Sequence, residues 1–250
     1  LGTCMNAQAE TTAITSDNSA LAATPYRPTV SNPAELPVPG YLELEVGWSQ
    51  SRSDDSHSKS MQYLAKYAFN PHWGVLIGGD AWTSRRGLGD TQSGRGDTFL
   101  LAKHLFDLDL PQQDLGLEVG VNLPTAKQGL GSAQTDYLLN GIHSLDLTED
   151  WRLDTNLGVT HLGAADANAG RNVLLWVSCL GYSTGKLGYA LELSGTHQSN
   201  VANTKQVLLA LSYAVTPRLV LDAAYIHMQQ DSARENMLLV GATWLVGKLF

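Results

Sequence analysis

The sequence lacks any long hydrophobic run. Its longest mostly apolar stretch, Val173 to Leu180, is far shorter than the roughly 18 apolar residues that a transmembrane helix needs. Charged side chains make up only 16% of the 250 residues, whereas hydrophobic ones reach 43%. The lack of a long apolar run argues against a helical membrane protein, and the charged fraction is low for a soluble domain. The apolar residues must therefore be distributed over many short segments.

Basic residues are also scarce. The formal net charge is -8 and the pI is near 5.2, and no Lys/Arg cluster suited to phosphate contacts is present, so we expect no nucleic-acid partner. Cys4 and Cys179 are too few for a metal cluster. The compact run Asp54-Asp55-Ser56-His57 is most simply a solvated loop, and we predict neither a metal nor a cofactor.

The first residues carry the pattern of an exported protein. Ala7-Gln8-Ala9 before Glu10 has the small-x-small form of a signal-peptidase site, which predicts that residues 1–9 are a signal-peptide remnant. A lipoprotein signal ending at Cys4 is the alternative, although Thr3 fits it poorly. Residues 10–39 are rich in Thr, Ser, Ala and Pro, which predicts an extended periplasmic segment or a plug in the mouth of the remaining domain.

From residue 40 to residue 250 the hydrophobic period changes to two. In Asp114 to Leu123 the odd positions are all apolar and the even ones are polar or Gly, which indicates strands with one apolar face. About twelve such segments occur, each close to the length that a tilted strand needs to cross a bilayer. They are residues 40–50, 59–70, 73–83, 95–106, 114–123, 133–146, 151–162, 171–182, 187–197, 204–215, 218–229 and 235–250.

These segments predict an all-β fold, an antiparallel up-and-down transmembrane β-barrel of about 12 strands in a bacterial outer membrane. Short turns alternate with longer polar connections, and the last strand, Glu235 to Phe250, is expected to pair with the first near Tyr41. A soluble all-β protein is the alternative, because 173–180 is apolar on both faces and residues 98–106 leave inside and outside ambiguous.

The segment from Leu123 to Tyr137, LPTAKQGLGSAQTDY, resembles the LPTG…GLGSG…DY signature of outer-membrane transporters of the phenol meta-pathway degradation family. The later Asn156 to Thr160 is similar to the family's N-x-G-Y-T strand. Ala126, Ala133 and Val159 depart from the family pattern, which leaves the inherited substrate open. The resemblance implies a β-barrel that moves aromatic or other small compounds. The C-terminal Phe250 likewise resembles the closing residue that the barrel-assembly machinery recognises.

If the apolar faces point to lipid, a set of charged residues lines the lumen, with acidic groups in excess. The simplest role for each of these residues is structural, in a cross-barrel ion pair such as that of Glu43 and Glu45 with Lys66. If they instead contact the solute, a net acidic lining would favour neutral or cationic solutes. The candidate lining residues are Glu43, Glu45, Lys66, Asp80, Lys103, Glu118, Asp136, Arg152, Asp154, Glu192, Arg218 and Asp222.

The function predicted from this lining is a non-enzymatic channel or transporter for small molecules, possible solutes being aromatic or other neutral compounds. Its expected partners are the lipid bilayer, lipopolysaccharide and a small-molecule solute. One alternative is a barrel hydrolase that uses His57 or His197 with neighbouring Ser residues. The other is a structural or adhesive barrel that binds a partner through its external loops.

Overall fold

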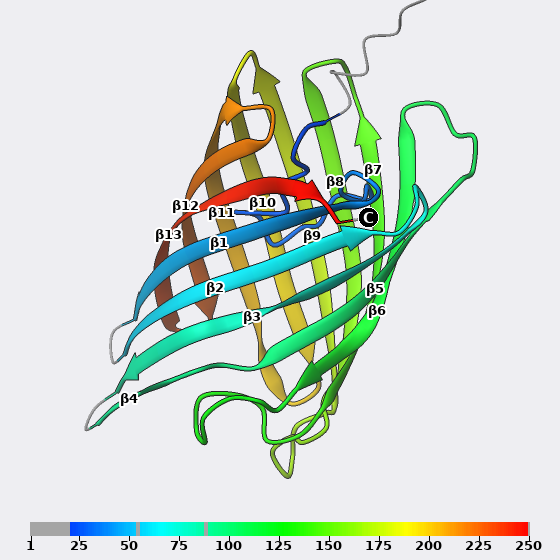
Figure 1. Cartoon of the computed structure of the whole chain (residues 1–250). Helices are drawn as coiled ribbons and strands as arrows, with labels where there is room; N and C mark the ends of the chain where they lie inside the picture. Colours follow the sequence, from blue (N-terminus) through cyan, green and yellow to red (C-terminus); the bar gives the residue numbers. More distant parts are fainter. Residues whose placement is uncertain (1–20, 54–55, 88–89, 250) are drawn as a thin grey trace, which may run out of the picture.

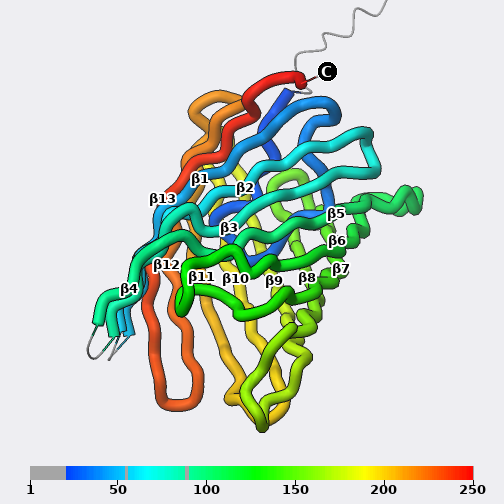
Figure 2. Tube along the Cα trace, turned by 60° about the horizontal axis from the view of Figure 1, so that its bottom comes forward, coloured from blue at the N-terminus to red at the C-terminus, as the bar shows by residue number. Residues whose placement is uncertain are grey.

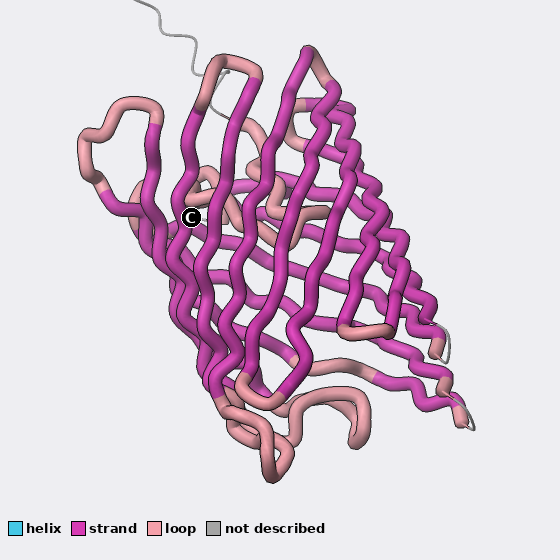
Figure 3. The backbone as a smooth tube through the Cα atoms, turned by 180° about the vertical axis from the view of Figure 1, so that it is seen from behind, coloured by secondary structure: helices cyan, strands magenta, loops and turns pink. Residues whose placement is uncertain are grey.

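The computed structural model describes residues 21–53, 56–87 and 90–249, and every regular element in them is a β-strand (Figures 1 and 3). No helix among these residues is long and apolar enough to cross a membrane. All 13 strands belong to one antiparallel sheet. The sheet closes on itself, because β1 pairs with both β2 and β13 and β2 pairs with β3. The short β4 only extends the sheet beside β3, so the predicted twelve-stranded barrel is confirmed.

The strands follow one another around the barrel in chain order. Their bounds are β1 Tyr41–Ser53, β2 His57–Ala68, β3 Trp73–Arg86, β4 Thr91–Gly94, β5 Thr98–Phe106, β6 Gln113–Leu123, β7 Asp136–Asp146, β8 Trp151–His161, β9 Asn172–Thr184, β10 Leu187–Gln198, β11 Val201–Thr216, β12 Leu219–Gln230 and β13 Ala233–Lys248.

The two ends of the barrel differ. We call the end at which β1 begins and β13 ends the turn end, and the opposite end the loop end. The prediction that long and short connections alternate is only partly right. Residues 124–135 and 162–171 are long at the loop end, but 199–200 and 231–232 are tight turns there, with Asn200 and Asp231 at positive φ, a conformation that Asn and Asp tolerate.

The predicted strand 95–106 is interrupted in the structure. β3 pairs with β5 as far as Gly79 and with β4 only from Thr83. Between these ladders Gly96 N–H donates to Asp80 O at 2.9 Å, and the irregular residues 95–97 separate β4 from β5. This irregular segment brings the Asp97 carboxylate to the long loop 124–135.

The outer surface carries the apolar face of each strand. Val119 on β6 and Leu157 on β8 are 48% and 67% exposed, although both are large hydrophobic residues that a soluble protein would bury. Aromatic rings cluster at the turn end, where Trp73 packs on His104 with ring centroids 4.2 Å apart. An exposed apolar belt with aromatic borders is the surface that a bilayer stabilises.

The closing seam joins β1 to β13. Tyr41 is the register partner of Lys248, and Gly47 that of Gly241, which confirms the predicted return of the last strand to the first. Phe250, the predicted assembly signal, lies outside the described residues.

Candidate functional site in the barrel lumen

Residues 21–40, called here the inner segment, run through the inside of the barrel (Figures 1 and 2). They form neither helix nor strand, as their prolines would predict. The side chains of Tyr26 and Ala34 are nevertheless almost fully buried, at 3% and 0% exposure. Buried backbone N–H groups need acceptors, and inward-facing side chains of the wall supply them.

Three glutamates accept hydrogen bonds from the inner segment's backbone. Glu43 accepts from Thr24 N–H at 2.9 Å, and Glu45 accepts from Tyr26 N–H at 2.8 Å. On the far wall, Glu192 accepts from Ser31 N–H at 2.8 Å. Carboxylates are strong acceptors for such amides, so these predicted lining residues hold the inner segment rather than face open water.

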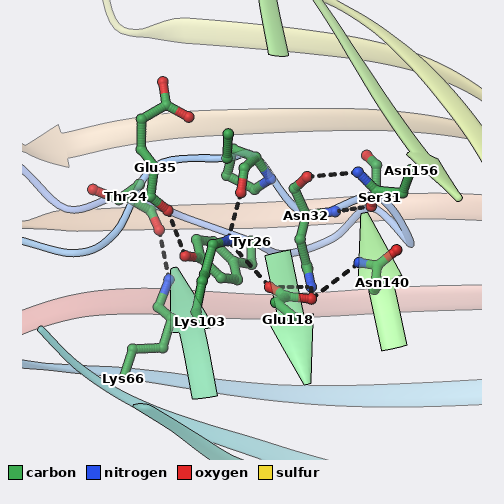
Figure 4. A network of polar contacts seen from close by, with 12 residues as sticks. Thr24, Tyr26, Ser31, Asn32, Glu35, Lys66, Lys103, Glu118, Asn140 and Asn156 are labelled. Atoms are coloured by element: carbon green, nitrogen blue, oxygen red, sulfur yellow. Dashed lines mark hydrogen bonds and ion pairs between the residues drawn. The ribbon is translucent and has the colours of Figure 1, made fainter. Parts of the chain in front are cut away.

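Amide side chains continue the same pattern around Asn32 (Figure 4). The backbone N–H of Asn32 donates to Asn156 Oδ1 at 2.7 Å, and Asn156 Nδ2 donates to the backbone carbonyl of Asn32 at 2.9 Å. Its own side-chain amide donates to Glu118 Oε2 at 3.0 Å, which also accepts from Asn140 at 3.0 Å. This reciprocal pairing fixes the middle of the inner segment against β6, β7 and β8.

Two buried lysines enclose Tyr26 (Figure 4). Lys66 Nζ lies 3.7 Å and Lys103 Nζ 4.2 Å from the centroid of its ring, close enough for cation–π attraction. Lys66 forms the expected ion pairs with Glu43 at 2.7 Å and Glu45 at 2.6 Å. Lys103 pairs with Glu118 at 3.1 Å. Tyr26 is therefore held from two sides, by Lys66 of β2 and by Lys103 of β5.

The other predicted lining residues divide into two groups. Arg152 reaches Glu35 of the inner segment together with Asp146 and Asp154 of the wall, and Asp222 meets Arg27 at 3.4 Å. Away from the inner segment, Asp136 accepts from Gly163 N–H at the loop end, and Asp80 lines a cavity described next. Arg218 donates to the carbonyls of Leu245 and Val246 at the turn end.

A cavity of about 570 Å³ opens at the loop end beside the inner segment. Tyr26, Tyr63, Leu64, Phe99 and Leu130 supply its apolar and aromatic lining. Its polar lining includes Arg27, Asn32, Gln62, Asp80 and Asn122. Thr29, Glu45, Arg85, Asp97 and Ser132 complete the polar lining. The cavity thus sets an aromatic and aliphatic patch beside many polar and charged groups, and a small organic molecule with one polar substituent could contact both.

The loop after β6 covers this cavity and is organised by Asp97. The Asp97 carboxylate accepts from Ser132 N–H at 2.6 Å and from Ala126 N–H at 3.0 Å. Burial acts to raise the pKa of Asp97, but these hydrogen bonds outweigh it and hold the pKa below its ordinary value. Leu130 of the same loop is 3% exposed. The family-like motif thus forms a fixed cap, and Gly129 adopts a φ of 85° within it.

The apolar part of the inner wall was not among the predicted lining residues. Leu76 and Leu101 pack on Tyr26, with Leu64, Phe99 and Leu138 beside them, while Leu208, Ala224, Ile226 and Leu239 form a second inward cluster. The signal was present in β5, where Phe99, Leu101 and Lys103 share one parity. Because Lys103 points inward with 0% exposure, its apolar neighbours of equal parity must also do so.

Other chemistry is not assembled among the described residues. They contain no group of three or more His, Cys, Asp or Glu side chains that could hold a metal ion. His57 borders a loop-end cavity with Ser56 and Ser58, whereas His197 accepts or donates a hydrogen bond with Asn203 at 2.8 Å. Cys4, Asp54 and Asp55 lie outside the described residues.

Comparison with known proteins agrees with this architecture. The family described as "Putative MetA-pathway of phenol degradation" matches residues 27–250. The chain belongs to this family. The suspected resemblance is therefore confirmed, and the match includes most of the inner segment as well as every strand. No curated protein sequence matches the chain.

Solved structures share the fold of this family member at low sequence identity. An outer-membrane channel from Pseudomonas putida F1 has a TM-score of 0.69 at 15% identity, covering 85% of this chain and 98% of its own. The NanC porin has a TM-score of 0.61 at 14% identity, covering 81% and 100%. The CymD monoaromatic hydrocarbon channel has a TM-score of 0.52 at 10% identity, covering 83% and 89%.

Proposed function

We propose that this protein is a channel of the bacterial outer membrane that passes small, neutral or aromatic molecules through its lumen. The loop-end cavity of about 570 Å³ carries the proposal. Its aromatic and aliphatic side chains would bind the body of an organic solute, and its amide and guanidinium groups would bind a hydroxyl or carbonyl. The phenol degradation family and the neighbouring channels support a solute of this class.

The outer membrane is the location in which this fold is stable. A closed barrel leaves no backbone edge unpaired in lipid, and the exposed side chains of the strands supply the apolar belt. The turn end then faces the periplasm, because bacterial barrels have short periplasmic turns and longer extracellular loops. Lipopolysaccharide contact and recognition of Phe250 by the assembly machinery remain predictions.

The inner segment acts as the plug of this channel. It crosses the lumen and is hydrogen-bonded to opposite walls through Glu45 and Glu192. Solutes must therefore pass beside it or displace part of it. The path of a solute is therefore determined by the space between the barrel wall and residues 21–40, and not by the full diameter of a twelve-stranded barrel.

A hydrolase is less well supported. General-base catalysis needs a base within hydrogen-bond reach of its nucleophile. Among the described residues, His57 Nε2 has no hydrogen-bond partner, and the ring of His197 is bonded to Asn203. The chemistry of the lumen favours passage of a solute over covalent catalysis.

The test is uptake of labelled phenol and of a sugar by proteoliposomes that contain the full chain. Phe99→Asn changes the apolar wall of the cavity, and we expect it to slow phenol uptake more than sugar uptake. Leu208→Asn is the control, because Leu208 is an inward residue of the other apolar cluster and does not line this cavity. If the folded protein passes neither solute, the channel proposal is wrong.

A further inference from the structure

Arg27 of the inner segment lies in a cradle built from four wall strands. Gln62, Gly47, Gly241 and Asp222 are successive register partners on β2, β1, β13 and β12. The Arg27 guanidinium donates to Gln62 Oε1 at 3.0 Å and meets Asp222 Oδ1 at 3.4 Å. The planar guanidinium group can contact two acceptors at once, here the side-chain oxygens of Gln62 and Asp222 at the two ends of this row of residues.

The two glycines form the floor of this cradle. A Cβ added to Gly47 would overlap Arg27, and its three nearest heavy atoms all belong to the guanidinium group. A Cβ added to Gly241 would meet both Arg27 Nε and Val46 O. Glycine is thus the residue that lets the guanidinium lie directly on the backbone at this place.

The same row of register partners continues from the cradle to two cavities. On one side Asp80 pairs with Gln62, and both line the loop-end cavity of about 570 Å³. On the other side Asp222 pairs with Ser212, and Ser212 with Gly188. Ser212 and Gly188 line a second cavity of about 220 Å³.

Arg27 stands between these two spaces. Arg27 and Thr29 line both the loop-end cavity and the second cavity. The second cavity reaches the turn end, because Ser183 and Gly188 lie next to the β9–β10 turn. If the Arg27 side chain left its cradle, the space it vacates would join the two cavities. The bottom of this joining groove would then be formed by Gly47 and Gly241 alone.

We propose that Arg27 is the gate and the charge-selecting residue of the passage, and that the Gly47–Gly241 cradle is its closed position. This inference rests on the proposed channel function and specifies its route. With Arg27 in place, the joining groove is filled and carries a positive charge. Without it, the groove is bordered by Asp80 and Asp222, whose carboxylates attract cations and repel anions.

Single-channel recording of the full chain in planar bilayers, with heat-modifiable migration as the check of folding, tests the gate. We expect Gly47→Ala and Arg27→Ala each to raise conductance severalfold over the wild type. Arg27→Ala should also shift the reversal potential in a salt gradient toward cation selectivity. Arg27→Lys keeps the charge but loses the fork, so conductance should rise with little change in selectivity.

The decisive variant combines Gly47→Ala with Arg27→Ala. Because Gly47→Ala acts by displacing Arg27, it should add nothing in the Arg27→Ala background. Gly181→Ala is the matched control, since a Cβ there has only ordinary contacts with the backbone, and it should leave conductance unchanged.

Two results would overturn the gate while leaving the channel intact. One is a conducting wild type whose conductance and selectivity match those of both single variants. The other is a further rise caused by Gly47→Ala when Arg27 is already absent. If the folded wild type and all variants pass neither ions nor phenol, the channel function itself fails.

Discussion

The inner wall of the barrel differs between two sides. β1, β2, β5 and β6 carry long charged inward residues, and among them Glu43, Lys66 and Lys103 are all 0% exposed because they contact the inner segment or each other. On β10 and β11 toward the turn end, the inward residues are small. Ala190, Ala210 and Ser212 border the cavity of about 220 Å³ beside the inner segment.

This difference gives each side its own role. Long charged side chains can reach the inner segment and satisfy its backbone, so that side anchors it. Small side chains cannot reach it and leave space, so that side provides room for a solute.

The largest effect should come from breaking the anchoring side with Lys66→Ala. This change leaves Glu43 and Glu45 buried without their cation, and losing one partner of a buried ion pair costs about 3–5 kcal/mol. We expect a lower denaturant midpoint and loss of the folded band in heat-modifiable gel migration. Lys59→Ala, on the exposed part of the same strand, should have little effect.

A compensated variant sharpens the first prediction. Lys66→Met combined with Glu43→Gln and Glu45→Gln removes all three buried charges, so most of the lost stability should return. If this triple variant is as unstable as Lys66→Ala, the ion-pair explanation of the anchoring side is wrong.

A smaller effect should follow from filling the open side with Ala190→Phe. The new ring would occupy much of the cavity of about 220 Å³, so solute uptake by proteoliposomes should fall. Stability should change little, because the ring enters existing space. Ala223→Phe, which faces outward on β12, serves as the control, and equal uptake by both variants would contradict a route along this wall.

The smallest effect should be local, at the loop that covers the anchoring side. Asp97 has a lowered pKa, so its stabilisation is complete above the ordinary Asp pKa of about 3.9 and is lost as pH falls through the folded value. We expect the protection factors of the Ala126 and Ser132 amides, which correct for the intrinsic pH dependence of exchange, to fall in acid.

In Asp97→Asn the same two amides should exchange quickly already at neutral pH, because the charged acceptor is gone. Asp90→Asn in the neighbouring exposed hairpin provides the control. Protection factors of these two amides that stay constant with pH in the wild type would show that Asp97 does not hold the loop.

Much of the barrel could be predicted because its signal is local. The alternation in residues 114–123 places Glu118 on the face opposite Val119, and the structure has the former buried and the latter exposed. The Glu43, Glu45 and Lys66 ion pairs were predictable because β1 and β2 are consecutive and antiparallel. The interruption near Asp97 was missed, since β4 and β5 keep the same register with β3 on both sides of it and the alternation of residues shows no break.

The candidate site was only half predictable. Charged inward residues such as Glu192 are visible in the sequence, but their partner, the backbone of Ser31, is distant and belongs to a segment without periodicity. The apolar inward residues Leu208 and Ile226 were missed because an apolar residue on either face of a strand looks the same in sequence.

A closed transmembrane barrel follows from local sequence features, because a period of two and the lack of long apolar runs permit few other ways to satisfy the backbone in lipid. What fills that barrel could be seen only in the folded chain. Arg27 meets Gln62, Gly47, Gly241 and Asp222 only when the first and last strands have closed. Such a meeting depends on register between strands far apart in the chain, which no local pattern of residues encodes.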